Sequence, residues 1–268
     1  MASDPLPVPA DRPAPNPLPS SPKPKCLVGI LMANSLESGC FEDRLACVTT
    51  VRGDGFTVRQ GAIQGRRLAL MITGTKPGQG VRGAEALVFG HSPRLVIAAG
   101  FASGLSARLE RGDLVVADSI MGNTRELLTL NRTVDRDLLS STPRLCVGRL
   151  LSFEQPIYRP AEKRSLGAEN GALAIDGQSL AVAKVCRGEN IPFVAVRVIV
   201  DTVDDELPPE VRRLTSRKTA AQRIGAVAGS LVRRPSSIKD LWNVYETSLA
   251  ASNTLANFLE AVVASVIV

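Results

Sequence analysis

Short apolar runs, each ended by glycine or a polar loop, constrain most strongly how this chain can fold. They recur at residues 26–32, 67–72, 94–99, 113–117, 145–151, 173–175 and 193–200. Runs of this length between turn residues are typical of buried β-strands. Stretches with helical spacing lie at residues 83–90, 161–169, 179–189, 216–232 and 238–268. The alternation predicts an α/β fold with helices on both faces of a sheet.

Two segments depart from this alternation. The segment around residues 52–63 contains Gly53-Asp54-Gly55 and resembles a hairpin, so we expect a mixed sheet. Residues 1–25 hold nine of the chain's 18 prolines, which predicts a disordered or polyproline-like tail. That tail is either a flexible leader or, through its spaced prolines, a partner-binding segment. Residues 26–268, rich in aliphatic side chains, are expected to form one domain.

The net charge of +6 is concentrated in one segment. Residues 211–239 contain eight lysines and arginines and no acidic residue. Such a run can meet nucleic acid, an anionic membrane surface or phosphate, but a solvated helix face is the interpretation that we favour. The segment carries no aromatic pattern of RNA-binding proteins, so we expect no nucleic-acid partner.

The five cysteines indicate a reducing cytoplasm. Their positions, 26, 40, 47, 146 and 186, show neither the C-x-x-C spacing of zinc sites nor a dense disulfide pattern. The amino terminus lacks a secretory signal, and no apolar stretch approaches the roughly 18 residues of a membrane span. We therefore expect a soluble protein without a bound metal.

A glycine-rich segment, residues 78–83, has the G-x-G-x-x-G pattern of dinucleotide-binding loops. A dinucleotide fold also needs an acidic residue at the end of the next strand, where this chain has Ala98-Ala99-Gly100. We therefore expect no dinucleotide cofactor. Two alternatives remain: backbone amides that approach an anion or a sugar, or glycines that permit close helix packing.

Two longer pairs of segments resemble a known family. Residues 96–105 read V-I-A-A-G-F-A-S-G-L and are followed at 109–116 by L-E-R-G-D-L-V-V. Residues 174–183 read A-I-D-G-Q-S-L-A-V-A and are followed at 191–201 by I-P-F-V-A-V-R-V-I-V-D. These patterns are similar to those of the nucleoside phosphorylase/nucleosidase superfamily, which includes purine nucleoside phosphorylases and methylthioadenosine/adenosylhomocysteine nucleosidases. The resemblance implies a three-layer α/β/α sandwich with a mixed central sheet, no cofactor, and a homo-oligomer.

The resemblance also implies two catalytic carboxyl groups. Asp201 matches the family's aspartate, which protonates or hydrogen-bonds N7 of the leaving purine. Glycosidic cleavage builds negative charge on the base, so an acid kept protonated by burial lowers the barrier. Glu37 matches the acid that activates water and contacts the sugar in hydrolytic members. The structural alternatives are a helix cap for Asp201 and a surface position for Glu37.

Several expected substrate-binding residues depart from the family's pattern. Gln178 replaces a glutamate that binds the ribose hydroxyls, and the lost charge costs about 1 to 2 kcal/mol of sugar binding. Gly177 replaces a methionine that packs on the sugar, which predicts an enlarged pocket. Phe101 replaces a serine that binds phosphate in phosphorylases, and Val200 replaces the serine beside the aspartate. The expected set of binding residues is completed by Gly100 and Ile157.

We therefore predict a cytoplasmic nucleosidase that hydrolyses the N-glycosidic bond of an adenine-type nucleoside such as methylthioadenosine or adenosylhomocysteine. One alternative is a phosphate-dependent phosphorylase with a relocated phosphate site, supplied by Arg44, Arg52 or Arg82. This includes the hopanoid-associated type, whose lipid substrate suits an enlarged pocket and contact with a membrane surface. The other alternative is a degenerate homologue that binds a nucleoside without cleaving it, as Gln178 and Phe101 suggest.

Overall fold

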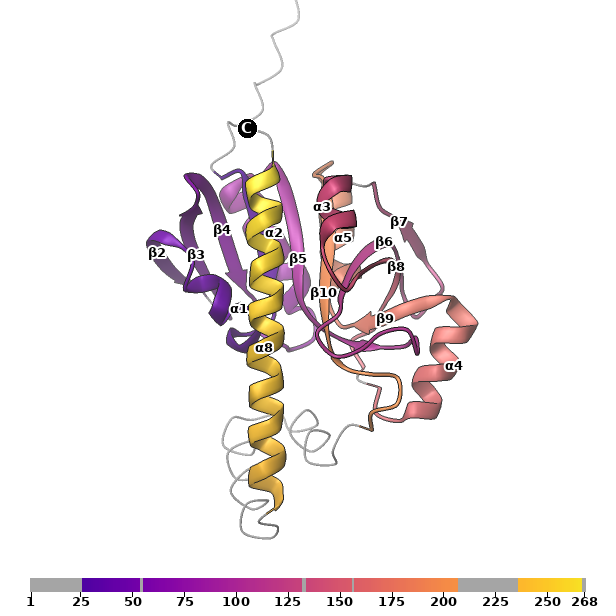
Figure 1. Ribbon diagram of the computed structural model, residues 1–268. Helices are drawn as coiled ribbons and strands as arrows, with labels where there is room; N and C mark the ends of the chain where they lie inside the picture. Colours follow the sequence, from indigo (N-terminus) through magenta and orange to yellow (C-terminus); the bar gives the residue numbers. More distant parts are fainter. Residues whose placement is uncertain (1–25, 54, 132–133, 156, 207–235, 267–268) are drawn as a thin grey trace, which may run out of the picture.

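A mixed β-sheet forms the middle layer of the protein, between two layers of helices (Figure 1). The computed structural model describes residues 26–53, 55–131, 134–155, 157–206 and 236–266, with side chains from residue 246 onward in the last range. The proline-rich tail at 1–25 and the expected helix at 216–232 lie outside the described residues.

The sheet has ten strands, in the order β10-β6-β8-β9-β5-β1-β4-β3-β2, with β7 beside β6. The strands are β1 (Val28–Met32), β2 (Ala46–Gly53), β3 (Phe56–Ile63), β4 (Arg66–Ile72), β5 (Leu95–Gly104), β6 (Leu114–Met121), β7 (Leu127–Thr129), β8 (Leu145–Ser152), β9 (Ala172–Asp176) and β10 (Phe193–Asp201). β1 pairs in parallel with β4 and β5, whereas β3 pairs antiparallel with both β2 and β4. The predicted mixed sheet and the predicted hairpin are therefore confirmed.

One end of the sheet closes on itself. β10 pairs in parallel with β5 and antiparallel with β6, so β5, β9, β8, β6 and β10 form a ring of paired strands. β1, β4, β3 and β2 extend β5 as an open sheet. Since β4, β1, β5 and β10 run parallel, their carboxyl ends lie at one edge.

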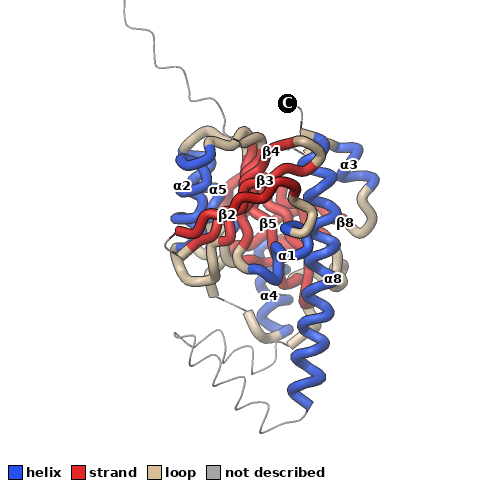
Figure 2. Tube along the Cα trace, turned by 90° about the vertical axis from the view of Figure 1, so that its left-hand side faces the viewer, coloured by secondary structure: helices blue, strands red, loops and turns tan. Residues whose placement is uncertain are grey.

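Helices cover both faces of the sheet (Figure 2). α2 (Gln79–His91) and α5 (Ser179–Gly188) pack together on one face, against β1, β4 and β10. α1 (Ser35–Glu42), α3 (Arg136–Ser141) and α8 (Ser236–Ser265) lie on the other. α4 (Pro160–Asn170) lies beside β9 at the closed end. The predicted three-layer sandwich is confirmed.

The first helix was not expected, because the helical spacing found in the sequence begins only at residue 83. Asn34 is its N-cap, and the Asn34 side chain accepts hydrogen bonds from the backbone N–H groups of Leu36 and Glu37. An asparagine followed three residues later by glutamate is a signature of a helix start. Glu37 is thereby placed in a rigid first turn.

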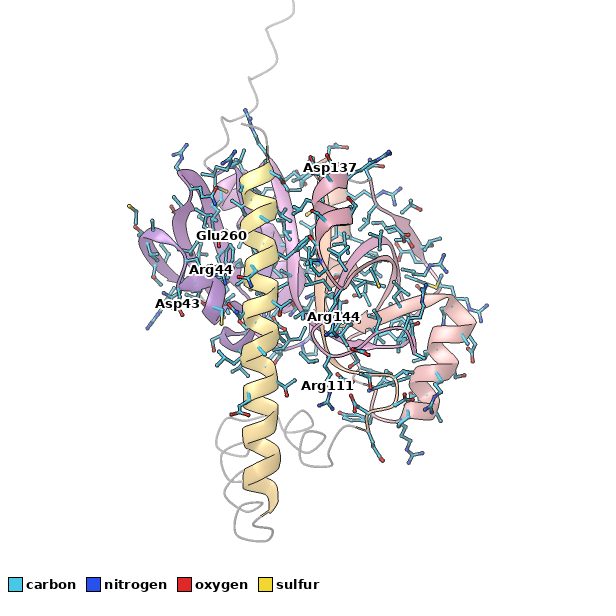
Figure 3. The ribbon with its side chains drawn as sticks, viewed as in Figure 1. Asp43, Arg44, Arg111, Asp137, Arg144 and Glu260 are labelled. Carbon is cyan, nitrogen blue, oxygen red and sulfur yellow. The ribbon has the colours of Figure 1, made fainter. Side chains whose placement is uncertain are left out.

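The last helix packs along the domain, as its apolar spacing predicts. Leu255, Phe258, Leu259 and Val262 are buried and share a cluster with Phe41 of α1. Arg44, directly after α1, donates to Glu260 at 3.0 Å and to the amide oxygens of Asn253 and Asn257 at 2.8 and 2.6 Å (Figure 3). No helix in the described part of the chain is both long and apolar enough to cross a membrane.

Gly83, at the end of the glycine-rich segment, permits close helix packing. A Cβ at Gly83 would lie 2.2 Å from Cγ2 of Thr73, so the glycine lets α2 approach the end of β4. The strand expected at residues 94–99 is longer than its apolar run, because β5 continues through Gly100 to Gly104. This extension carries residues 100–104 beside the carboxyl end of β10.

We predict that the contact of α8 with the sheet contributes strongly to stability. Leu259 is fully buried, so Leu259→Ala should lower the free energy of unfolding by about 2 to 5 kcal/mol. Leu249 on the same helix is 51% exposed, and Leu249→Ala should change it by less than about 0.5 kcal/mol. Urea denaturation followed by circular dichroism measures both, and equal effects would contradict the packing described here.

Candidate active site

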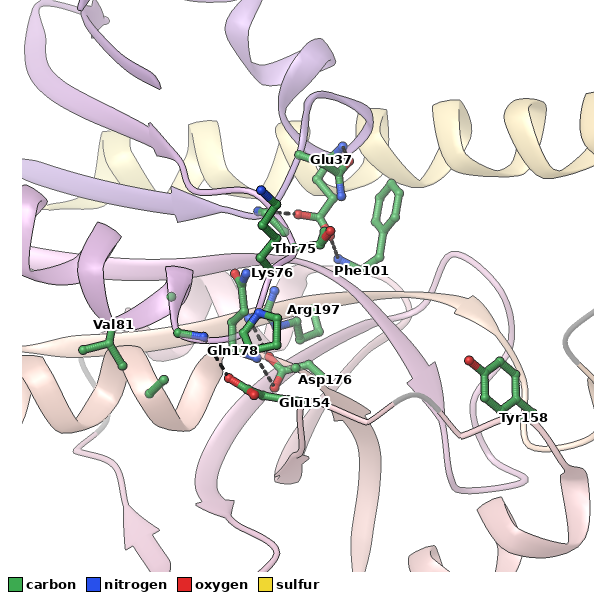
Figure 4. Close-up of a pocket in the computed structure, with 17 residues that line it drawn as sticks. Glu37, Thr75, Lys76, Val81, Phe101, Glu154, Tyr158, Asp176, Gln178 and Arg197 are labelled. Atoms are coloured by element: carbon green, nitrogen blue, oxygen red, sulfur yellow. Dashed lines mark hydrogen bonds and ion pairs between the residues drawn. The ribbon is translucent and has the colours of Figure 1, made fainter. Parts of the chain in front are cut away.

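A cavity of about 750 Å³ opens at the edge where the parallel strands end (Figure 4). Residues that follow β1, β4 and β9 line it together with residues of β5 and β10. The lining residues are Ala33, Asn34, Glu37, Thr75, Lys76, Pro77, Gly78, Gly80, Val81, Phe101, Glu154, Tyr158, Asp176, Gly177, Gln178, Ala181 and Arg197. The expected site residues Glu37, Phe101, Gly177 and Gln178 are therefore brought to one cavity.

Glu37 is held in this cavity by backbone amides. Its side chain is almost fully buried, its Oε2 accepts from the N–H of Ala33 at 2.8 Å, and its Oε1 accepts from the N–H of Phe101 at 3.2 Å. Burial raises the pKa of the Glu37 carboxyl, while Arg197 and these N–H groups lower it. A fixed carboxylate with a raised pKa is suited to accept a proton from water.

Arg197 is a buried cation beside Glu37. Its Nη2 donates to Oδ2 of Asp176 at 2.5 Å and to Oγ of Ser179 at 2.9 Å, whereas its Nε is buried and has no hydrogen-bond partner among the described residues. Arg197 and Gly100 are paired in register on β10 and β5. A Cβ at Gly100 would lie 2.6 Å from Nη1 of Arg197 and 2.8 Å from Oε2 of Glu37. Because Gly100 has no side chain, the guanidinium group of Arg197 and the carboxyl group of Glu37 can both lie close to it.

Gln178 lies across the cavity, at the start of α5. Its Nε2 donates to the carbonyl of Gly74 at 2.9 Å and to Oγ1 of Thr73 at 3.4 Å. The amide therefore ties α5 to the end of β4, a role that a glutamate could not fill because a carboxylate has no hydrogen to donate.

A second, smaller cavity of about 250 Å³ adjoins the first and shares Phe101, Glu154, Asp176 and Gly177 with it. Ile157, Phe153, Ile175 and Val200 add apolar surface, and Ser103 lies on its wall. An apolar slot with few polar groups is suited to a flat heterocycle. The expected residue Ile157 therefore lies in the smaller cavity, apart from Glu37.

Asp201 lines neither cavity. Its side chain is almost fully buried at the end of β10, where Oδ1 accepts from Oγ of Ser103 at 2.8 Å and Oδ2 forms an ion pair with Lys163 of α4. Burial raises the pKa of Asp201, while Lys163 and Ser103 lower it. Ser103 lines the smaller cavity, so Asp201 contacts a residue of that cavity's wall.

The sequence analysis did not assign Arg197, Asp176, Ser103 or Lys163 to the site. Arg197 and Asp176 lie inside the segments that carried the family resemblance, so those segments held the signal for them. Lys163 resembles any lysine on an exposed helix, and no pattern near it signals burial. The described part of the chain contains no cluster of side chains suited to hold a metal ion.

Several solved structures that share this fold are nucleosidases or hydrolases. A mutant 5'-methylthioadenosine nucleosidase of Helicobacter pylori with methylthioadenosine in its active site matches with a TM-score of 0.68 and 16% identity, over 90% of this chain and 99% of its own. Futalosine hydrolase of Helicobacter pylori matches with a TM-score of 0.69 and 15% identity, over 90% and 99%. S-adenosylhomocysteine nucleosidase of Streptococcus pyogenes matches with 0.67 and 16%, also over 90% and 99%. At these identities the likeness establishes the fold.

The family is established by sequence. Residues 28–233 match the model of the phosphorylase superfamily, which covers most of the chain. This range includes both pairs of motif segments and every residue of the two cavities. The chain belongs to the phosphorylase superfamily, the family of nucleoside phosphorylases and nucleosidases that act on N-glycosidic bonds.

Proposed function

We propose that the protein is a nucleosidase that hydrolyses the N-glycosidic bond of an adenine-type nucleoside. The observation that carries the proposal is the buried Glu37 carboxylate, fixed by two backbone N–H groups beside Arg197 in a cavity large enough for a nucleoside. The sugar would lie in the larger cavity near Gly177 and Gln178, and the base in the smaller one near Phe101 and Ile157.

In this arrangement Glu37 takes a proton from the attacking water. Its carboxylate also stabilises the positive charge that develops on the sugar, because Coulomb attraction is strong where water is excluded. The charge of Arg197 lowers the pKa of the Glu37 carboxyl and so opposes the effect of burial, which raises it. Activity should therefore decrease as the pH falls through the pKa of Glu37.

Asp201 acts on the other side of the bond. Asp201 contacts Ser103, which lines the cavity proposed for the base. We propose that Asp201 stabilises the leaving base by proton donation or by hydrogen bonding. Burial raises the pKa of Asp201, the direction that proton donation requires, and Lys163 opposes it. The hydrogen bond from Ser103 holds Asp201 next to a residue of the cavity wall.

Hydrolysis is favoured over phosphorolysis by the same carboxylate. The N–H of Phe101 already donates to Glu37, so phosphate placed there would meet a buried negative charge instead of a free donor. Lys76 lines the larger cavity and is the group that favours the phosphorylase alternative, since its ammonium can attract an anion. The two reactions differ in whether phosphate is consumed.

A nucleoside panel assayed with and without phosphate tests the proposal. We expect free adenine to be released from methylthioadenosine, adenosylhomocysteine and adenosine. For each nucleoside, the rate with phosphate should equal the rate without it. Strict dependence on phosphate, with formation of a sugar phosphate, would establish the phosphorylase, and release from none of the panel would leave a binding protein.

Glu37→Gln and Asp201→Asn should each lower kcat by about 100-fold or more, because each removes a charge or proton from the reacting bond. Both substitutions keep the side-chain volume, and thermal melting confirms that the fold persists. Near-full activity of either variant would remove that residue from the mechanism.

Gly100→Ala should decrease kcat/KM by about 100-fold, because the new methyl group displaces Glu37 or Arg197 from its position. Overpacking should also lower the free energy of unfolding by about 1 to 3 kcal/mol. Gly39→Ala on α1 is the matched control, since nothing lies within 4 Å of its added Cβ. Equal kcat/KM values for Gly100→Ala and Gly39→Ala would show that the space Gly100 leaves for Glu37 and Arg197 is not needed for activity.

Gln178→Glu should increase kcat/KM by about 5- to 30-fold, because the new carboxylate stabilises the cationic sugar of the transition state. The variant loses the bond to the Gly74 carbonyl, so its melting temperature should decrease. Gln64→Glu adds the same charge at an exposed turn and should leave the rate unchanged. An unchanged or lower rate for Gln178→Glu would show that the missing charge does not limit catalysis.

A further inference from the structure

Asp176 is a buried carboxyl group that lines both cavities and has no part in the chemistry proposed so far. Each contact that the structure gives its side chain is with a hydrogen-bond donor. Its Oδ1 accepts from the backbone N–H groups of Gln178 and Ser179 at 3.3 and 3.2 Å. Its Oδ2 accepts from the N–H and the hydroxyl of Ser179 and from Nη2 of Arg197. A carboxyl group that meets only donors is a carboxylate.

The guanidinium group of Arg197 is bound to Asp176 and only faces Glu37 (Figure 4). Its Nη2 lies 2.5 Å from Oδ2 of Asp176, whereas Nη1 and Oε2 of Glu37 lie 2.6 and 2.8 Å from the position of a Cβ at Gly100. Within the described part of the chain, Arg197 has its ion pair with Asp176 and none with Glu37, whose oxygens accept from backbone N–H groups. One buried cation thus serves two carboxyl groups and binds one of them.

The number of charges in this cluster affects the protonation of Glu37. With Asp176 ionised, the cluster of Glu37, Arg197 and Asp176 has one net negative charge when Glu37 is ionised and none when Glu37 is protonated. Burial disfavours net charge, so it favours proton uptake by Glu37, and burial does raise the pKa of this carboxyl. Without the charge of Asp176, the neutral state would be the one with Glu37 ionised, and proton uptake would be opposed.

Other charged groups near Glu37 are offset or lie at the surface. Lys76 and Glu154 line the same cavity, have opposite charges and are exposed. The other acids of α1 and α8 whose side chains the structure describes are paired with an arginine or exposed: Glu42, Glu246 and Glu260. The balance of buried charge beside Glu37 is therefore determined by Arg197 and Asp176.

The same net charge acts on the sugar. Cleavage of the glycosidic bond makes the sugar cationic, and a negative charge in a site that excludes water stabilises this cation. Gln178, where the family resemblance implies a glutamate, brings no charge. Asp176 lies two residues earlier and lines both cavities, so its charge is placed where the sugar and the base are proposed to meet.

We propose that Asp176 is a positioning residue that makes Glu37 an effective base: it holds Arg197 on the β9 side and leaves one net negative charge beside the sugar. The inference rests on the proposed function, because Glu37 is taken to accept the proton of water. In that step the water oxygen bonds to the sugar carbon, the proton passes to Glu37, and the electrons of the glycosidic bond leave with the base.

The first experiment measures the ionisation of Glu37 without any turnover. The protein is labelled with ¹³C-glutamate, the Glu37 carboxyl signal is assigned by its loss in Glu37→Gln, and its shift is followed against pH. Asp176→Asn should lower the midpoint by about one pH unit or more, because asparagine keeps the acceptor for the two backbone N–H groups but removes the charge.

The matched control is Asp135→Asn. Asp135 caps α3 as Asp176 caps α5, with its Oδ1 accepting from the N–H groups of Asp137 and Leu138. The control makes the same substitution at a helix start away from the cavities, and it should leave the midpoint of Glu37 unchanged.

Arg197→Gln tests the sign of the effect. Loss of the cation leaves Glu37 beside an uncompensated negative charge, so its midpoint should rise by about one pH unit or more. Circular dichroism checks the fold of each variant, and a pair with a merely structural role would not give opposite shifts. An unchanged or higher midpoint in Asp176→Asn, or an unchanged or lower one in Arg197→Gln, would overturn the inference.

The second experiment follows kcat and kcat/KM for methylthioadenosine against pH. In Asp176→Asn the acidic limb should move to lower pH, and kcat at pH 7 should decrease by about tenfold or more, because Glu37 is a weaker base and the sugar cation has lost a charge. Asp176→Glu keeps the charge and should keep the wild-type limb. A decrease of kcat with the acidic limb unchanged would show a structural role and contradict the inference.

The titration separates the inference from the proposed function. A wild-type protein that cleaves no nucleoside would count against the proposed function, while the midpoints of Glu37 in the variants still decide the role of Asp176. Conversely, full nucleosidase activity with the same midpoint in wild type and Asp176→Asn would leave the function standing and remove Asp176 from it.

Discussion

The pairing of Gly100 with Arg197 on adjacent parallel strands is the constraint on which the site depends. A side chain at position 100 would occupy the space where the guanidinium group and the carboxylate of Glu37 approach each other. Because Arg197 also binds Asp176, one cation holds the ends of β5, β9 and β10 and the first turn of α1 in a fixed relation. The geometry of the proposed site therefore depends on strand register more than on loop conformation.

Buried charge on the two sides of the site is balanced by two separate cations. Arg197 offsets Asp176 and Glu37 in the larger cavity, and Lys163 offsets Asp201 behind the smaller one. Separate partners allow each carboxyl group to have its own pKa, as the proposed hydrolysis would require of Glu37 and Asp201. Glu37 and Asp201, which are far apart in the sequence, therefore have separate charge partners in the structure.

Much of the fold was predictable from the sequence, because buried strands leave apolar runs and turns leave glycines. The strands around Val28, Ile97 and Val196 and the packing of the last helix followed from such patterns. α1 was missed although Asn34 and Glu37 carry the spacing of a helix start, since the segment is too short to show apolar periodicity. The pairing of Lys163 with Asp201 joins residues 38 positions apart and leaves no local trace, so no reading of neighbouring residues can reveal it.

The contact between α8 and α1 has a consequence for how the enzyme matures. Ser252 of α8 donates to the backbone carbonyl of Glu37 at 3.1 Å, across 215 residues of chain, and Phe41 packs in the same cluster as Leu259. During synthesis, the strands that the structure describes, which end at Asp201, are made before α8. The first turn of α1, which carries Glu37, therefore lacks its contact with Ser252 until that residue has been synthesised.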